Sequence, residues 1–364
     1  MISDKKWMIY GANGYTGRLV VEEAIKKGLK PILAGRSESV KELADDKGLD
    51  SQVFDLSSND DMIEQLSHVS VLANCAGPFS QTAEPMMRAC INTHTHYIDI
   101  TGEISVYEMG YGLDTEAKSA EIVICPGVGF DVIPTDCLAA YLKEKMPDAT
   151  HLALGFAMKG SKVSKGTAKT SVEGMAHGGK IRENGEMKHV PLAFKEREID
   201  YGFGPRNAIT IPWGDVYTAF HSTGIPNIEV YYPNSSKSAA KLRKRQKYMK
   251  LLKVNWIKKI VQNRIDKIWK SNTAAQRAEA KSYVWGEVKN STGESIEGRL
   301  TTVDGYDLTA CGTVEVAEYL LADPSQSGYF TPSLLMGKDL LEKMPGFSGI
   351  EYKALSHFFD FSRS

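Results

Sequence analysis

The chain lacks the features that mark a membrane-spanning or a disulfide-bonded protein. Its 364 residues contain no apolar run approaching ~18 residues, and the polar residues 1–6 lead directly into an apolar stretch, so neither a membrane span nor a signal peptide is predicted. The five cysteines form no C-x-x-C pair, and the histidines show no metal-ligand spacing. We therefore expect reduced thiols, no metal site and a cytoplasmic location.

An excess of charge of either sign is also lacking, since the formal net charge is −1, but the distribution is uneven. Residues 237–281 hold 15 Lys and Arg against Asp266 and Glu279, with apolar residues at helical spacing that include Trp256 and Trp269. This pattern predicts a basic helical segment. It could contact an acidic carrier protein or an anionic membrane, or present a solvated face above the protein's own core. Nucleic acid is not expected, because no binding module accompanies the helix.

What the sequence does contain is a glycine motif at its start. Residues 7–10 predict a buried strand and residues 18–25 a helix, and the loop between them has the spacing G-x-x-G-x-x-G. Backbone N–H groups and the positive end of the helix dipole would meet there, where a pyrophosphate can bind. The predicted loop residues are Gly11, Asn13, Gly14, Tyr15, Thr16 and Gly17. The alternative is a glycine-rich turn without a ligand.

The next strand, predicted over residues 31–34, ends where an NAD site would carry a carboxylate for the ribose. Arg36 and Ser37 stand there instead and suit a 2′-phosphate, which favours NADPH over NADH. A solvated Arg36 at a strand end is the alternative. Asp55, in a third strand predicted over residues 53–56, could accept a hydrogen bond from the adenine amino group or serve as an ordinary turn residue.

Strands and helices alternate through the first part of the chain, and longer strands follow from about residue 150. The fold class predicted is α/β, with a Rossmann-type doubly wound parallel sheet and a second α+β domain of mostly antiparallel sheet. We divide the chain into an NADP-binding domain (1–135), a substrate and oligomerisation domain (136–305) that includes the basic helical segment 237–281, and a C-terminal helical segment (306–364) packing back on the first domain. A homodimer is left open.

Three further strands are predicted over residues 69–75, 97–100 and 122–125, and the loops after them should surround the nicotinamide. They add six cofactor-binding residues, which are Ala76, Gly77, Pro78, Phe79, Gly102 and Phe130. Glu103 and Asp131 are the candidate catalytic acids, because carboxyl groups beside a cofactor can supply a proton after hydride transfer. The alternative role for Asp131 is to cap the helix that starts near Pro134.

Five motifs resemble those of the saccharopine dehydrogenase-like oxidoreductases, a family that includes saccharopine reductases and trans-acting enoyl reductases. They are YGANGYTG (10–17), AGR (34–36), NCAGPF (74–79), YIDITGE (97–103) and PGVGFDVIPTD (126–136). The resemblance is specific over the first 140 residues, and the remainder is more loosely similar to the enoyl-reductase-like branch. Residues 133–136 depart from the saccharopine reductase pattern, which has a glycine after the proline and a histidine shortly beyond, and this disfavours an amino-acid substrate.

The resemblance implies an NADPH-dependent oxidoreductase that reduces a C=C, C=O or C=N bond. An apolar or acyl-type substrate is favoured by aromatic residues of the second domain such as Tyr201, Trp213 and Tyr217. One alternative is a non-catalytic NADPH-binding sensor or a lipid- or carrier-docking protein. Another is a saccharopine-type imine reductase.

Overall fold

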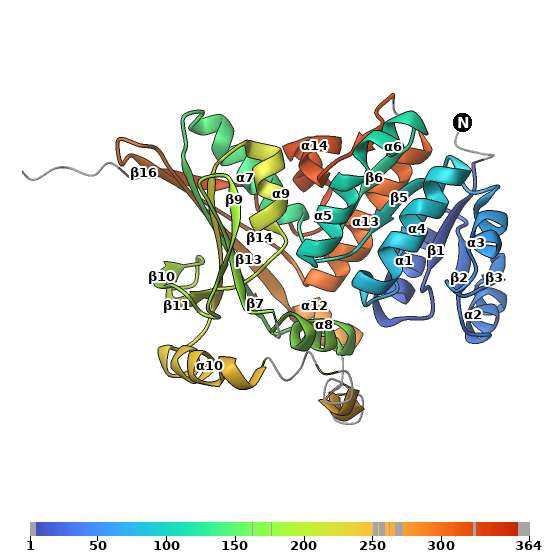
Figure 1. Ribbon diagram of the computed structural model, residues 1–364, viewed down its shortest axis with the longest axis horizontal. Helices are drawn as coiled ribbons and strands as arrows, with labels where there is room; N and C mark the ends of the chain where they lie inside the picture. Colours follow the sequence, from blue (N-terminus) through green and yellow to red (C-terminus); the bar gives the residue numbers. More distant parts are fainter. Residues whose placement is uncertain are drawn as a thin grey trace, which may run out of the picture.

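Two β-sheets with their helices form the two halves of the molecule (Figure 1). The computed structural model describes residues 5–161, 163–175, 177–249, 254, 259–261, 263–265, 272–322 and 325–355. In the view of Figure 1 the seven-stranded sheet lies on the right and the nine-stranded sheet on the left. The predicted fold class is confirmed.

The first sheet is parallel throughout, with the strand order β15-β6-β5-β4-β1-β2-β3. Its strands are β1 (Trp7–Tyr10), β2 (Ile32–Gly35), β3 (Ser51–Val53), β4 (Val71–Asn74), β5 (His96–Asp99), β6 (Val123–Cys125) and β15 (Gly328–Tyr329). The order reverses between β1 and β4, which creates a crevice at the carboxyl ends of these strands. The third strand ends before Asp55, so the predicted range 53–56 was placed too late in the chain.

Side chains of β1 alternate between two hydrophobic clusters, one on each face of this sheet. Trp7 and Ile9 pack with α1 (Tyr15–Lys26), α2 (Ser39–Lys47) and α13 (Gly305–Leu321). Met8 and Tyr10 pack on the opposite side. The helices there are α3 (Asn59–Leu66), α4 (Phe79–Thr93), α5 (Ile104–Gly112) and α6 (Asp114–Ser119). The sheet is therefore doubly wound and buried on both faces.

The second sheet is antiparallel except where β12 and β7 pair in parallel. Its strands are β7 (His151–Lys159), β8 (Gly179–Glu183), β9 (Glu186–Val190), β10 (Glu196–Asp200), β11 (Pro205–Thr210), β12 (Asn227–Pro233), β13 (Lys281–Lys289), β14 (Ser295–Val303) and β16 (Glu351–Leu355). Helices α7 (Ile133–Lys145) and α9 (Asp215–Thr223) pack together and contribute to the core of this half. A Cβ on Gly286 would lie 2.8 Å from the Leu142 side chain, so this glycine lets α7 approach the sheet closely.

The C-terminal part of the chain joins both halves. Helix α13 packs on α1, and β15 extends the first sheet, whereas β16 extends the second. The helices α14 (Pro332–Met336) and η2 (Lys338–Lys343) lie between the two strands in the sequence. The C-terminal segment packs on the first half as predicted through α13, and it also contains two strands, one of which joins the second sheet. The predicted boundary at residue 135 falls inside α7, which continues across it.

The basic segment is not one helix. It includes α10 (Ser236–Met249) and the separate α12 (Ala274–Glu279), which begins at a capping box formed by Thr273 and Gln276. Trp256 and Trp269 lie outside the described residues. Among the helices that the structure describes, none is long and apolar enough to cross a membrane.

Candidate cofactor and active site

The glycine loop lies between β1 and α1 and depends on two close backbone contacts. Gly11 has a φ of +79°, and a Cβ there would lie 2.9 Å from the backbone nitrogen of Ala76. A Cβ on Gly17 would lie 2.2 Å from the Gly11 carbonyl oxygen. Both positions therefore require glycine, one for its conformation and its contact with the loop after β4, the other for packing of helix against loop.

The backbone N–H groups at the start of α1 suit a phosphate ligand. The helix N-cap is Gly14, which provides no side-chain cap, and its first turn contains no acidic residue. Gly14 itself is exposed with a φ of −71°, so it does not need the left-handed region. The positive end of the helix dipole thus faces an open position over the loop, which is the arrangement that binds a pyrophosphate.

Hydrogen bonds connect this loop to the residues after β2, where a 2′-phosphate would lie. The Asn13 side-chain nitrogen donates to Ser39 Oγ at 2.8 Å, and Ser39 Oγ is 3.1 Å from Ser37 Oγ. Arg36, which directly precedes Ser37, is exposed. Ser39, the first residue of α2, was missed by sequence reasoning, although a serine at a helix start is a recognisable signal. This polar group of hydroxyls and a guanidinium suits an anionic ligand.

Two predicted cofactor residues have other partners in the structure. Asp55 is exposed and forms a turn in which its carboxylate accepts hydrogen bonds from the Ser57 backbone and hydroxyl, which lower its pKa. Tyr15 donates from its hydroxyl to the Asn272 carbonyl at 3.1 Å, and its ring packs edge-on against Tyr306. The turn role of Asp55 is therefore present, and contact of either residue with a cofactor stays a prediction, as it does for the partly exposed Thr16.

A buried polar network holds the three loops at the carboxyl ends of β4, β5 and β6 together. Asp99 is fully buried and accepts from the backbone N–H groups of Thr101 at 3.0 Å and Gly127 at 2.9 Å, and from Tyr97 Oη at 2.8 Å. Burial raises the pKa of Asp99 to about 6, although these three hydrogen bonds favour its charged form. Asn74 donates to the same Tyr97 hydroxyl at 3.2 Å. The network fixes the position of each loop.

The loop after β4 holds its predicted cofactor residues in different surroundings. Ala76 lies against Gly11, and Gly77 and Pro78 are exposed or partly exposed. Phe79 instead is buried, with its ring in the core of the first half. Phe130 is likewise buried, 5.4 Å from the Phe156 ring. Lining of the nicotinamide pocket by these two rings therefore conflicts with their burial in the protein core.

Glu103 caps a helix. Its two carboxylate oxygens accept hydrogen bonds from the backbone N–H groups of Phe79 and Ser80, each at 2.9 Å. These N–H groups are at the N-terminus of α4, where the helix dipole also stabilises an anion. A carboxylate held in this way is a poor proton donor. The structure therefore favours a capping role for Glu103, and its catalytic role stays a prediction.

Asp131 is different, because it does not cap α7. The N-cap of that helix is Val132, with no side-chain cap, so the predicted capping role of Asp131 was wrong. Its carboxyl faces the loop after β5, where a Cβ added to Gly102 would lie 2.8 Å from Asp131 Oδ2. Desolvation by burial raises the pKa of Asp131 to about 7. A carboxyl with such a pKa can hold or release a proton near neutral pH.

The N-terminal turn of α13 packs over the same loop and supplies a residue that sequence reasoning missed. Thr309 Oγ1 accepts from the Phe130 backbone N–H at 3.0 Å. Tyr306 has Asp131 among the charges that affect its raised pKa, and its hydroxyl is 3.1 Å from Thr167 Oγ1 of α8 (Lys165–Met175). Tyr306 therefore lies between Tyr15 of the glycine loop and α8 of the second half. Because Tyr306 is far from these segments in the sequence, no local pattern indicated that it would lie beside them.

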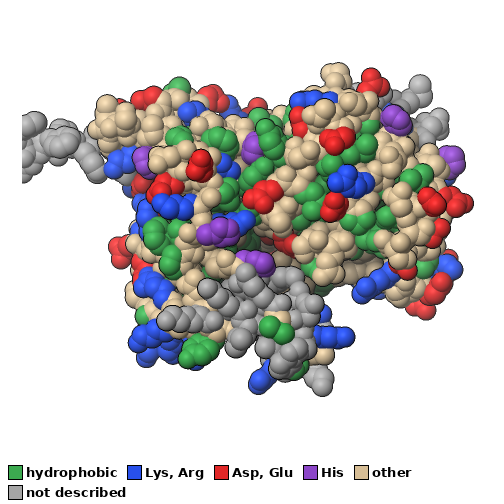
Figure 2. Space-filling model, in the orientation of Figure 1, with side chains coloured by type: hydrophobic (Ala, Val, Ile, Leu, Met, Phe, Trp, Pro, Cys, Tyr) green, Lys and Arg blue, Asp and Glu red, His purple; other side chains and the backbone are tan. Residues whose placement is uncertain are grey.

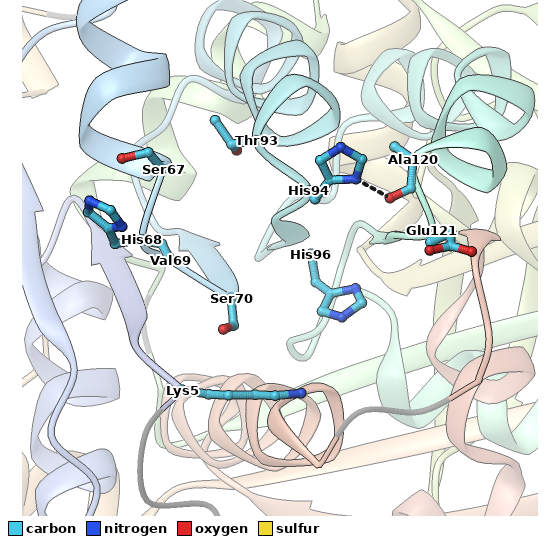
Figure 3. Close-up of a pocket in the computed structure, with 10 residues that line it drawn as sticks. All are labelled: Lys5, Ser67, His68, Val69, Ser70, Thr93, His94, His96, Ala120 and Glu121. Carbon is cyan, nitrogen blue, oxygen red and sulfur yellow. Dashed lines mark hydrogen bonds between the residues drawn. The ribbon is translucent and has the colours of Figure 1, made fainter.

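A shallow cavity of about 430 Å³ lies at the opposite edge of the first sheet (Figure 3). Ten residues line it, and they are Lys5, Ser67, His68, Val69, Ser70, Thr93, His94, His96, Ala120 and Glu121. They lie before, or at the first residue of, β1, β4, β5 and β6, whereas the glycine loop follows β1. Among the described side chains, no group of three or more His, Cys, Asp or Glu is placed to hold a metal. This cavity is therefore separate from the cofactor crevice.

The fold and the glycine loop define a dinucleotide-binding α/β protein with a second sheet domain. Residues 7–125 match the saccharopine dehydrogenase NADP binding domain. The chain is 32% identical to a saccharopine dehydrogenase-like oxidoreductase of Bos taurus over 51% of its own length and 50% of the relative's. It is 30% identical to a trans-acting enoyl reductase of Mycobacterium leprae over 35% and 33% of the two chains. The chain is therefore similar to the saccharopine dehydrogenase-like oxidoreductases over about half of its length.

A solved structure shows the same fold over almost the whole chain. Apo saccharopine dehydrogenase (L-Glu forming) from Saccharomyces cerevisiae is 10% identical, covers 97% of this chain and 100% of its own, and has a TM-score of 0.64. The chain spans about half the length of the curated relatives that it first matches. The predicted resemblance to these oxidoreductases and the NADP cofactor are confirmed. The individual site residues and the cytoplasmic location stay predictions.

Proposed function

We propose that this protein is an NADPH-dependent reductase in which Asp131 supplies the proton. The observation that carries the proposal is the Asp131 carboxyl, which faces Gly102 at the carboxyl ends of β5 and β6 and has a pKa of about 7. In a doubly wound sheet the ligand binds at this edge. Asp131 is thus a titratable group next to the expected position of the reacting atoms.

NADPH, when bound, would supply the hydride. The N–H groups at the start of α1 would hold its pyrophosphate, and Arg36 with Ser37 its 2′-phosphate. Protonated Asp131 would donate its proton to the substrate atom that gains negative charge and would then recover one from solvent. Gly102 permits that approach, because a larger residue would occupy the space beside the carboxyl.

An apolar or acyl-type substrate is supported by aromatic side chains of the second half. The rings of Trp213 and Tyr232 lie 4.5 Å and 5.3 Å from the Phe156 ring, which in turn contacts Phe130 next to Asp131. Trp213 Nε1 is buried without a hydrogen-bond partner among the described residues, so it is a donor that a substrate oxygen could use. These side chains favour a carbonyl-containing apolar substrate over a charged amino acid.

The decisive experiment measures NADPH oxidation by the purified protein with a panel of substrates. The panel contains enoyl and ketoacyl thioesters, apolar aldehydes and ketones, and imines formed from amino acids. We expect turnover with an apolar carbonyl or enoyl compound and loss of turnover in Asp131→Asn with NADPH affinity retained. NADPH binding without oxidation of any compound would instead support the alternative of a non-catalytic sensor. Contact with a carrier protein and a homodimer stay predictions that this assay does not address.

A further inference from the structure

The outer face of α10 is a strip of exposed cations. Lys237, Lys241, Lys244 and Arg245 are all exposed, and Tyr248 at the end of the same face is 72% exposed. The helix sequence contains no acidic residue. In the part of the chain that the structure describes, none of these four cations forms an ion pair. Figure 2 shows Lys and Arg side chains gathered at the lower left, where Figure 1 places α10.

The inner face of α10 holds the helix firmly on the second sheet. Ala239 and Leu242 pack into a small hydrophobic cluster with Ala193 and Ile209. Arg243, on the inner side, donates from Nε to the Ala193 carbonyl at 2.8 Å and pairs with Glu196. The helix is therefore anchored through contacts that do not involve the four outer cations.

Exposed aromatic rings accompany this strip. Tyr248 ends it, and a second exposed ring, Phe194 (42% exposed), directly follows the Ala193 that the inner face of α10 covers. Aromatic rings with one apolar and one wet side are typical of the interface between headgroups and acyl chains. Lysine and arginine next to such rings are typical of surfaces that bind anionic phospholipids.

We propose that the outer face of α10, with Tyr248, binds an anionic phospholipid surface. A convex helix that carries one sign of charge on long flexible side chains matches a broad layer of negative headgroups. An acidic protein would be matched better by a groove with fixed partners for each charge. The proposal goes beyond the reductase function and does not depend on the reaction.

The test is cosedimentation of the full chain with vesicles of phosphatidylcholine alone or mixed with phosphatidylserine. We expect binding only to the mixed vesicles, with a steep decrease as salt rises through roughly 0.05 to 0.3 M. Each neutralised cation should weaken binding about fivefold, and reversal of Lys237, Lys241, Lys244 and Arg245 to Glu should weaken it by more than about a hundredfold. Tyr248→Ser should weaken binding to a smaller extent.

The matched control reverses four exposed lysines on the first half, Lys30, Lys41, Lys47 and Lys118, which gives the same change in net charge. Tyr352→Ser is the control for Tyr248, since Tyr352 is 52% exposed on β16. NADPH titration and circular dichroism show that each variant is folded. Equal binding to neutral vesicles, equal loss in the control, or binding to polyglutamate but to no vesicle would overturn the proposal.

Discussion

At the scale of single residues, substitution of Arg36 tests whether the protein prefers NADPH to NADH. Arg36 is exposed beside Ser37, and it occupies the place where an NAD site carries a carboxylate. We expect NADPH to bind more tightly than NADH, and Arg36→Ala to remove about 1.5–3 kcal/mol of the NADPH binding free energy, because a charge-assisted hydrogen bond is lost. Fluorescence titration with both cofactors measures this difference. Equal affinities of the unmodified protein would contradict the assignment.

Asp131 is the residue whose protonation we expect to control turnover. Because its pKa is raised to about 7, the proton needed for donation is present below that pH and is lost above it. The rate of the chemical step should therefore fall as pH rises through about 7. A pH profile of kcat in the unmodified protein checks this, and a flat profile between pH 5 and 9, roughly two units either side of that pKa, would exclude Asp131 as the proton donor.

The same residue should lower stability at alkaline pH. A carboxyl whose pKa is higher in the folded than in the unfolded state binds more protons when folded, so the stability it contributes is lost as pH rises through about 7. Asp131→Asn should therefore increase the free energy of unfolding relative to the unmodified protein above that pH. Urea denaturation at acidic and alkaline pH measures the change. Glu103→Gln is the contrast, since it weakens hydrogen bonds to the N-terminus of α4 and should destabilise.

At the scale of elements, the cofactor-binding role of the glycine loop and α1 can be tested in a protein that still folds. Gly14 is exposed and has a φ of −71°, so Gly14→Val is compatible with the backbone, although its Cβ would be 3.1 Å from the Gly11 carbonyl. The new side chain would occupy the position above the helix N-terminus, and NADPH affinity should fall by at least about 2 kcal/mol. Gly112→Val, with open space around its Cβ, is the control. Unchanged titration curves for Gly14→Val would place the phosphate elsewhere.

At the scale of the whole molecule, the two halves should unfold together. Helix α13 packs on α1, while β15 and β16 extend different sheets, and Arg277 links the glycine loop through Tyr15 to Asp307 of α13. We expect one thermal transition, which NADPH at about 100 times its Kd would stabilise by ~2.7 kcal/mol. Scanning calorimetry with and without NADPH tests this. Two transitions, of which NADPH moves only one, would show that the halves are independent.

Local patterns predicted the parts of the fold that depend on nearby residues. The strand, glycine loop and helix at the start of the chain, and most of the longer strands of both sheets, follow from hydrophobic runs and glycine spacing, whereas β8, β9 and β10 were not predicted. The single basic helix was wrong because Thr273 and Gln276 start a new helix inside it. The short β15 and β16 had no signal of their own, because their pairing partners are distant in the sequence.

For the site, the sequence by itself determined the resemblance to the family, the cofactor and the two candidate carboxylates, since these depend on residue types in short motifs. Only the tertiary structure distinguished the role of Glu103 from that of Asp131. Glu103 meets the N-terminus of α4, whereas Asp131 lies desolvated beside Gly102, with Tyr306 of α13 close enough to be affected by its charge. A pKa depends on burial and on neighbouring charges, and the folded chain brings those together from segments that no local pattern connects.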